Sequence, residues 1–236
     1  MTESDKPRRF YEAVTVIEVD GGFGVNLDQR RLRTPSGAHF VAPTRALAEA
    51  CAEEWAGQGT HIIPASMPIT QLAFAAIDHT PNRRDELGDY IAKFGETDLV
   101  CHRAEAPADL VARQAAAWDS VRDWCAAFVG ADLPVVTGVL PAGVSPGKLA
   151  KLRAAALALD DFRLTALAQA AGLAGSAAIA FALTHGALTP AAAFEAAALD
   201  DLWSQEKWGA DAEAQARLDR QRAEFESLAQ FIASLG

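Results

Sequence analysis

Asp98, Cys101 and His102 are residue types that a cysteine hydrolase combines. A thiolate nucleophile needs a histidine base, and a carboxylate that orients that base. The spacing argues against this chemistry, because adjacent side chains of an extended segment point to opposite faces and Cys101 would diverge from His102. The sequence therefore does not favour cysteine catalysis at this position.

Residues 143–149 come near the pattern of a phosphate-binding loop. That loop requires four residues between its glycines and a Ser or Thr after its lysine. Here three residues separate Gly143 from Gly147, and Leu149 follows the lysine. Pro146 also removes one of the backbone N–H groups that such a loop offers to phosphate. A helix-initiating loop without nucleotide is the better interpretation.

Metal and dinucleotide chemistry also lack their usual patterns. The glycines at 21, 22 and 24 do not complete a dinucleotide fingerprint, because Leu27 takes the final glycine position. No two histidines have the i, i+4 spacing of a helical metal site; they are His39, His61, His79, His102 and His185. Three carboxylate pairs are typical of solvated helix ends: Glu53-Glu54, Asp160-Asp161 and Asp200-Asp201. We therefore predict no catalytic residue, no metal and no cofactor.

The composition is that of a globular protein with an acidic surface. The 236 residues include 21 basic and 31 acidic side chains, which gives a formal net charge of −10. Nucleic-acid binding draws most of its affinity from basic patches, and only short basic runs occur here, at residues 6–9 and 30–33. An acidic surface suits a basic protein partner or serves solubility. We expect no nucleic-acid partner.

The features that bear on localisation indicate a bacterial cytoplasmic protein. The 3 cysteines are widely spaced without a C-x-x-C motif, which favours a reducing compartment. Residues 1–9 are polar and carry two acidic residues, unlike a secretory signal or a mitochondrial presequence. The most apolar stretch, 164–183, is interrupted by polar residues and falls short of the roughly 20 apolar residues that span a bilayer. We expect no membrane insertion.

Hydrophobic periodicity divides the chain into a β-rich part and a helical part. Alternation predicts an antiparallel β-meander from strands at residues 11–19, 23–27, 30–34 and 39–41. Later segments have helical spacing, with expected starts at Thr44, Thr70, Thr80, Pro107 and Thr189. Helices are expected over residues 110–128, 148–159, 162–171 (ended by Gly172), 176–185, 190–202 and 218–235, with a Pro- and Val-rich connection or short strand at 133–140.

Segregated strands and helices favour an α+β fold. We predict a small β-rich N-terminal domain with helices at its end, residues 1–85. We expect an all-helical C-terminal domain to follow it, residues 86–236. A chain of this length buries enough surface to fold without a disulfide or a metal.

The tryptophans separate into core residues and a candidate surface. Trp55 and Trp118 lie on apolar helix stripes and are expected in the core. Trp203 and Trp208 flank four polar residues, and a spacing of five places them about 140° apart on a helix. One buried stripe does not easily take both, so at least one is a candidate anchor for a protein partner.

Short motifs then occur in one order along the whole chain. In the N-terminal part they are Arg9-Phe10-Tyr11, Gly22-Phe23, Thr34-Pro35, Glu54-Trp55-x-x-Gln58 and Met67-Pro68-Ile69-Thr70. In the C-terminal part they are Thr97-Asp98-x-x-Cys101-x-Arg103, Trp118 and Gln205-x-x-Trp208-Gly209. No single motif is diagnostic, but their ordered combination resembles the Atp-twelve family of F-type ATP synthase assembly chaperones.

This resemblance implies an ATP-independent chaperone, not an enzyme. Such a protein binds the free alpha subunit, prevents its aggregation and releases it as the alpha/beta hexamer forms. The residues expected to contact the partner are Asp200, Asp201, Trp203, Glu206 and Trp208. Trp55 and Gln58 are expected to give structural support. Because the family's acidic stretch here has Asp in place of Glu, the key acidic contact stays open among Asp200, Asp201 and Glu206.

Two other classes of function stay open. One is an enzyme with an active site between the two domains, and the other is a small-ligand-binding module at the same place. A pocket with convergent polar and titratable groups would favour either of these. An open apolar surface with an acidic rim would favour the chaperone.

Overall fold

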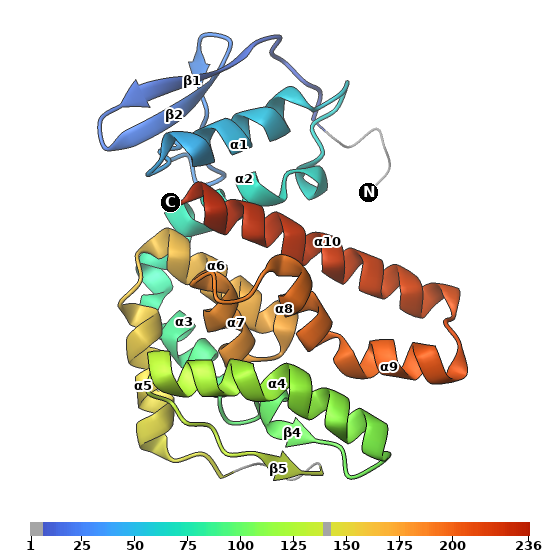
Figure 1. The fold of residues 1–236 in the computed structure, drawn as a ribbon. Helices are drawn as coiled ribbons and strands as arrows, with labels where there is room; N and C mark the ends of the chain where they lie inside the picture. Colours follow the sequence, from blue (N-terminus) through green and yellow to red (C-terminus); the bar gives the residue numbers. More distant parts are fainter. Residues whose placement is uncertain (1–6, 139–142) are drawn as a thin grey trace.

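The computed structural model describes residues 7–138 and 143–236 and has a smaller and a larger lobe (Figure 1). The expected polar N-terminus and the expected 133–140 connection therefore lie partly outside the described residues. The smaller lobe contains β1 (Val14–Val19), β2 (Gly22–Leu27), β3 (Arg30–Arg31), α1 (Arg45–Ala56), the 3₁₀ helix η2 (Pro64–Ser66) and α2 (Pro68–Asp78). The fold class is α+β, as predicted.

The sheet of the smaller lobe is a three-stranded antiparallel meander in the order β1-β2-β3. Its first hairpin pairs Val14 with Leu27 and Val19 with Gly22. The predicted third strand is shorter than expected, since β3 covers two residues. The predicted fourth strand, 39–41, is wrong: this part of the chain makes isolated bridges, His39 to Arg33 and Ala42 to Phe23, and no continuous ladder.

The first helix begins where the sequence predicted. The Thr44 hydroxyl accepts a hydrogen bond from the Leu47 N–H at 3.1 Å and caps α1. One later predicted start is wrong, since helix α2 begins with Pro68 at its first position, two residues before Thr70. Helix α3 (Thr80–Phe94) begins at Thr80, as predicted. The Thr80 hydroxyl does not cap this helix and bonds instead to that of Thr165 at 2.6 Å.

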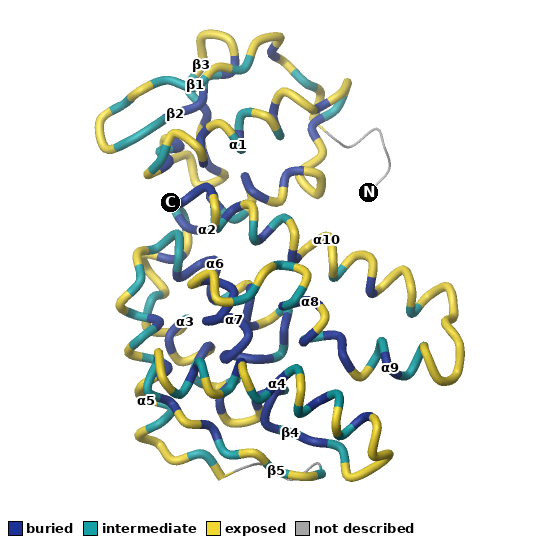
Figure 2. Tube along the Cα trace, in the orientation of Figure 1, coloured by how far each residue is buried: buried dark blue, intermediate teal, exposed yellow. Residues whose placement is uncertain are grey.

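The larger lobe is almost entirely helical. Its elements before the C-terminal pair are α3, η3 (Leu99–Cys101), β4 (His102–Arg103), α4 (Ala108–Phe128), β5 (Val136–Thr137), α5 (Pro146–Leu157), α6 (Asp161–Ala174), α7 (Ala177–Thr184) and α8 (Pro190–Ala197). Strands β4 and β5 form one short parallel pair. Strand β5 lies in the segment 133–140 that was expected as a connection or short strand, whereas β4 was not predicted. Every residue of α7 is buried, so this apolar helix forms the centre of the lobe (Figure 2).

Three predicted details of the helical lobe are wrong. Helix α6 ends at Gly175, whose φ of +64° suits a glycine, and continues past Gly172. The expected 190–202 helix is two helices, because the backbone at Ala198 leaves helical geometry. Phe128, expected on the buried stripe of α4, is 56% exposed and stacks on Trp124 at the helix end.

Helices α9 (Leu199–Trp208) and α10 (Ala212–Ser234) form the C-terminal hairpin, and α10 ends beside the smaller lobe (Figure 1). There the Thr44 hydroxyl donates to the carbonyl of Ser234, which joins α1 to α10. The N-terminal half of α10 is mostly exposed, with Leu218 as its buried contact (Figure 2). The predicted boundary between residues 85 and 86 falls inside α3, and the division into two domains stays a prediction.

Candidate partner-binding site

Helix α9 presents one tryptophan to the core and one to solvent. Trp203 is 6% exposed, whereas Trp208 at the last position of α9 is 75% exposed. Their rings meet edge to face with centroids 5.2 Å apart. The predicted angular separation of the two side chains is therefore confirmed.

Two of the predicted acidic residues are held in ion pairs with neighbouring helices. The carboxylate of Glu206 accepts two hydrogen bonds from the Arg113 guanidinium of α4, at 2.6 and 2.9 Å. These bonds lower the pKa of Glu206 and raise the pKa of Arg113. Asp201 pairs with Arg217 of α10 at 3.0 Å. Both carboxylates are already neutralised by the chain's own cations.

Asp200 differs from these two acids. Its carboxylate accepts a hydrogen bond from the Gln114 amide at 2.8 Å, and the same amide accepts the Ala104 N–H at 2.8 Å. Within residues 7–138 and 143–236, no cationic side chain forms a salt bridge with Asp200. Asp200 is also exposed. It is the member of the predicted acidic set that offers an uncompensated charge to a partner.

Asp200 and the two tryptophans line a groove of about 530 Å³ between α9 and the start of α4, which we call the α4–α9 groove. Its apolar wall includes Pro107 and Leu110 in addition to the two indole rings. Its polar lining includes Asp200, Gln114 and Arg103. The surface combines apolar walls with one carboxylate, Asp200, and that it binds a partner stays a prediction.

Arg103 lies at the base of this groove and is 8% exposed. Its guanidinium bonds to Asp119 at 2.8 Å and lies 5.2 Å from the ring centre of Trp118. Burial lowers the pKa of Arg103, although Asp119 opposes that effect. Its Nε and Nη1 are buried and have no hydrogen-bond partner among the described residues. Both atoms are closed off from solvent, and donors of this kind are costly to leave unpaired.

Trp55 and Gln58 lie in the smaller lobe, apart from this groove. Trp55 is 8% exposed, and its carbonyl accepts the Tyr11 hydroxyl at 2.8 Å. The buried Gln58 amide donates to Ser66 and accepts the Ile63 N–H at 2.7 Å. Burial of Trp55 is confirmed. The structural-support role of both residues stays a prediction, and their contacts agree with it.

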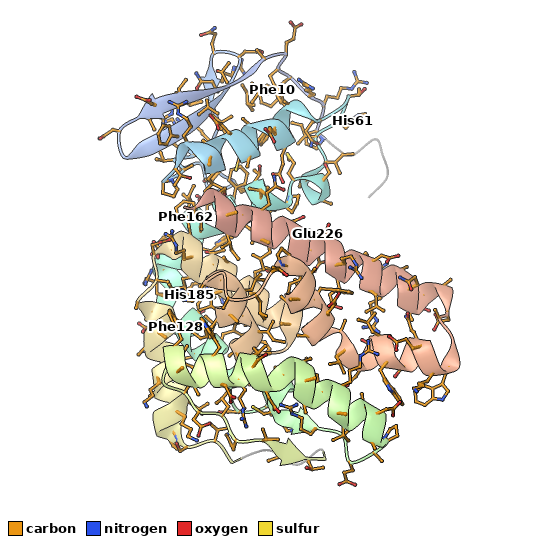
Figure 3. All side chains as sticks on the ribbon, in the orientation of Figure 1. Phe10, His61, Phe128, Phe162, His185 and Glu226 are labelled. Carbon is orange, nitrogen blue, oxygen red and sulfur yellow. The ribbon has the colours of Figure 1, made fainter. Side chains whose placement is uncertain are left out.

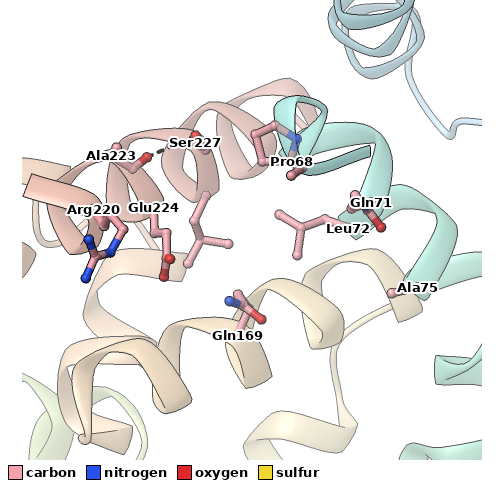
Figure 4. Close-up of a pocket in the computed structure, with 11 residues that line it drawn as sticks. Pro68, Gln71, Leu72, Ala75, Gln169, Arg220, Ala223, Glu224 and Ser227 are labelled. Atoms are coloured by element: carbon pink, nitrogen blue, oxygen red, sulfur yellow. Dashed lines mark hydrogen bonds between the residues drawn. The ribbon is translucent and has the colours of Figure 1, made fainter. Parts of the chain in front are cut away.

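A second groove, of about 500 Å³, lies where α2 of the smaller lobe meets α6 and α10 (Figure 4). Leu72 and Leu228 supply apolar contact, and Gln169 points into the space (Figure 4). Arg220 and Glu224 are its ionisable lining residues, and neither histidine nor cysteine lines it. This is the place that the enzyme and ligand-binding alternatives require. Its hydroxyl-bearing residue, Ser227, donates to the Ala223 carbonyl at 2.9 Å and not to the Glu224 carboxylate.

The residues first considered for catalysis have structural surroundings. Burial raises the pKa of the Cys101 thiol to about 12, so the thiol stays protonated at neutral pH. Asp98 is fully buried and accepts the Ala178 N–H at the start of α7, at 3.1 Å. Lys148 lies in the first turn of α5, which begins at Pro146, as the helix-initiating interpretation predicted. Among the described residues no group of three metal-ligating side chains occurs.

Sequence reasoning missed the α4 side of the α4–α9 groove. Pro107 was predicted only as a helix start, and no role was predicted for Gln114 or Arg113. A signal existed, since a glutamine on an apolar helix stripe needs a polar partner when it is buried. The partner itself was not predictable, because Asp200 lies 86 positions away.

Comparisons with known proteins define the class. A family model described as ATP12 chaperone protein matches residues 8–126. The crystal structure of Atp12 from Paracoccus denitrificans is 36% identical, covers 98% of this chain and 99% of that chain, and has a TM-score of 0.91. A variant of the Paracoccus protein with an aspartate replaced by lysine gives the same identity and TM-score, covering 98% of each chain. A protein of Agrobacterium tumefaciens, described as a chaperone candidate, is 37% identical with a TM-score of 0.91, covering 98% of this chain and 87% of that one.

The protein is therefore a chaperone by class. It belongs to the ATP12 family of ATP synthase assembly chaperones that its sequence resembles. None of the described helices has both the length and the hydropathy to cross a membrane.

Proposed function

We propose that this protein is an ATP-independent assembly chaperone, not an enzyme, that binds the free alpha subunit of F-type ATP synthase. It keeps that subunit from aggregating until the alpha/beta hexamer forms, and it acts in the bacterial cytoplasm. The contact with the subunit includes α9, with Asp200, Asp201, Trp203, Glu206 and Trp208 as its predicted residues. The family membership supports the general role, and the surface of α9 supports the place.

The observation that carries the proposal is the exposure of Trp208. A tryptophan that is 75% exposed leaves a large apolar surface in water, which is unusual unless a partner covers it. It adjoins the α4–α9 groove, whose edge carries the uncompensated Asp200. Aromatic side chains in pockets with a polar rim are typical anchors of protein interfaces.

The mechanism follows from mass action. An unassembled subunit exposes the apolar surface that its neighbours cover in the finished complex, and such surface aggregates. A chaperone that binds this surface lowers the concentration of free subunit without consuming ATP. It must bind more weakly than the beta subunit does, so that beta displaces it.

Reducing conditions suit this protein. Cys51, Cys101 and Cys125 are all unbridged and buried. Burial raises the pKa of each thiol to about 12, which makes them poor nucleophiles. These cysteines support a cytoplasmic site of action and give no support to thiol catalysis.

Co-expression with the alpha and beta subunits of the same host tests the proposal. The tagged protein is expected to retain alpha without beta, and to suppress light scattering by purified alpha. Trp208→Ala is expected to lose retention. Phe10→Ala is the matched control, because Phe10 is 58% exposed but lies on the smaller lobe (Figure 3).

Two results would overturn the proposal. One is that alpha is not retained and its scattering is unchanged by the wild-type protein. The other is that Trp208→Ala retains alpha as fully as Phe10→Ala does, which would remove Trp208 of α9 from the interface. In the first case the groove in Figure 4 becomes the place to screen for small-molecule ligands.

A further inference from the structure

We propose that the α4–α9 groove takes a segment of the client in which an arginine or lysine pairs with Asp200 and an adjacent apolar side chain packs on Trp208. This inference rests on the proposed function, because the client is the alpha subunit. It goes further by assigning the chemistry of the bound segment and by selecting one acid of three.

Among the three acidic residues, Asp200 is the one whose charge is not already paired with a cation in the described part of the chain. Glu206 is engaged by Arg113 through two hydrogen bonds, and a partner cation would have to displace that guanidinium. Asp201 is engaged in the same way by Arg217. Asp200 accepts a neutral amide from Gln114, which leaves its full charge available. A basic side chain entering the groove therefore meets one carboxylate that costs no existing ion pair.

The apolar walls of the groove favour an apolar client side chain next to the basic residue. Pro107 and Leu110 face the groove together with the indole rings of Trp203 and Trp208. An aliphatic side chain buries apolar area on these walls at roughly 25 cal/mol per Å². The faces of the tryptophan rings also attract a guanidinium or an ammonium group. An arginine or lysine thus has both a carboxylate and an aromatic partner within one groove.

Arg103, which also lines the groove, does not disfavour a basic client residue there. It is more than nine-tenths buried, and its Nε and Nη1, which have no partner among the described residues, have almost no surface open to solvent. Its positive charge does not repel a basic client residue strongly, because Asp119 pairs with it at 2.8 Å.

Other segment chemistries fit less well. An all-apolar segment would cover the Asp200 carboxylate without pairing it, and an unpaired buried charge is strongly unfavourable. An acidic segment would meet Asp200 and a chain whose formal net charge is −10. The groove therefore discriminates in favour of a basic residue next to an apolar one.

Photo-crosslinking identifies the segment. Trp208→p-benzoylphenylalanine keeps an aromatic side chain at the rim, and mass spectrometry of its crosslink to purified alpha maps the contact. Affinities for alpha are then measured for Asp200→Asn, Asp200→Lys and Asp201→Asn. Asparagine at 200 still accepts the Gln114 amide, so this variant is expected to keep its fold, and its thermal unfolding checks this.

We expect the crosslinked segment to carry an arginine or lysine. Asp200→Asn is expected to weaken binding at least about tenfold, whereas Asp201→Asn stays within about threefold of wild type. Asp200→Lys loses binding, and an alpha variant with glutamate in place of that basic residue restores it. Binding by the wild type is expected to weaken as salt rises.

The possible failures are distinguishable. If the wild type binds alpha but the segment has no basic residue, or if Asp200→Asn binds like wild type, this inference is wrong and the proposed function stands. If Asp201→Asn alone loses binding, the selection of Asp200 is wrong. If the wild type does not bind alpha, the proposed function fails and takes this inference with it.

Discussion

Gln114 of α4 and Asp200 of α9 are joined by a hydrogen bond of 2.8 Å across 86 positions of sequence. The other end of the Gln114 amide accepts the Ala104 N–H, so one buried side chain ties three segments together. Gln114 is 2% exposed, and both of its functional atoms are satisfied. Satisfied buried amides of this kind fix orientation, because any shift leaves polar groups unpaired.

Gln114→Glu is expected to destabilise the protein by about 2–3 kcal/mol at pH 7. The new carboxylate would face Asp200 at hydrogen-bond distance, and two such groups do not both stay ionised. The folded protein would then bind more protons than the unfolded chain, so its stability is expected to rise as pH falls toward 5. Urea unfolding at pH 7 and pH 5 measures both effects.

Gln114→Leu is the control. It removes both hydrogen bonds and leaves the Ala104 N–H unpaired, for a loss of about 1–3 kcal/mol. Leucine does not titrate, so the loss relative to wild type is expected to be the same at the two pH values. Equal pH dependence of the glutamate and leucine variants would contradict the proximity of Asp200.

Short-range signals were sufficient to predict much of the fold. The N-caps at Thr44 and Thr189 depend on contacts three residues away, so a single sequence carries the whole signal. Local contacts did not allow a prediction of which glycine, Gly172 or Gly175, ends α6. Gly172 lies inside α6, where the Tyr90 hydroxyl of α3 is 2.8 Å from the position that a Cβ would take. That contact is tertiary, and no local pattern encodes it.

The candidate site likewise has features that the local sequence predicts and features that depend on tertiary contacts. The opposite exposure of Trp203 and Trp208 was predictable from helix geometry alone. The neutralisation of Glu206 by Arg113 was not, since 93 positions separate them. The three acids therefore had equal weight in the sequence, and only the tertiary ion pairs distinguish Asp200 from the other two.

Asp98→Asn tests the buried carboxylate at the start of α7. Burial raises the pKa of Asp98 from 3.8 to about 6, so between these values the folded protein keeps a proton that the unfolded chain has lost. Folded-state stability from this group therefore falls as pH rises. The stability difference between wild type and Asp98→Asn is expected to be about 1.4 kcal/mol smaller at pH 7.5 than at pH 5. Urea titrations at the two pH values measure it.

Thr189→Ala is the matched control for this experiment. It removes an uncharged cap, the Thr189 hydroxyl that accepts the Ala192 N–H at 3.2 Å at the start of α8. The expected loss is about 1 kcal/mol and does not change between pH 5 and 7.5. If the Asp98→Asn difference is also constant, Asp98 titrates as an ordinary aspartate in the folded protein.

Gly22→Ala tests the close approach between the first hairpin and the segment before α1. Gly22 has φ +150°, and a Cβ there would overlap the carbonyl oxygen of Ala42. The backbone would have to move, which breaks the paired hydrogen bonds between Phe23 and Ala42. We expect a loss above about 2 kcal/mol by thermal or urea unfolding.

Gly21→Ala separates the close contact from backbone strain. Gly21 has φ +84°, and no atom lies within 4 Å of the position that a Cβ would take, so only the strain of a left-handed residue applies. Its expected loss is about 1 kcal/mol. Equal losses for the two alanine variants would mean that the Ala42 contact is not limiting.

Trp203→Ala and Trp208→Ala are expected to separate stability from binding. Trp203 is buried against the larger lobe, and its truncation is expected to cost about 3–5 kcal/mol. Trp208 is 75% exposed, so its truncation is expected to change the free energy of unfolding by less than about 1 kcal/mol. Urea unfolding ranks the two variants, and retention of the alpha subunit is then compared at matched folded concentration. Because Trp208→Ala keeps the fold, its loss of alpha would report the interface directly; full retention by this variant would exclude Trp208 as an anchor.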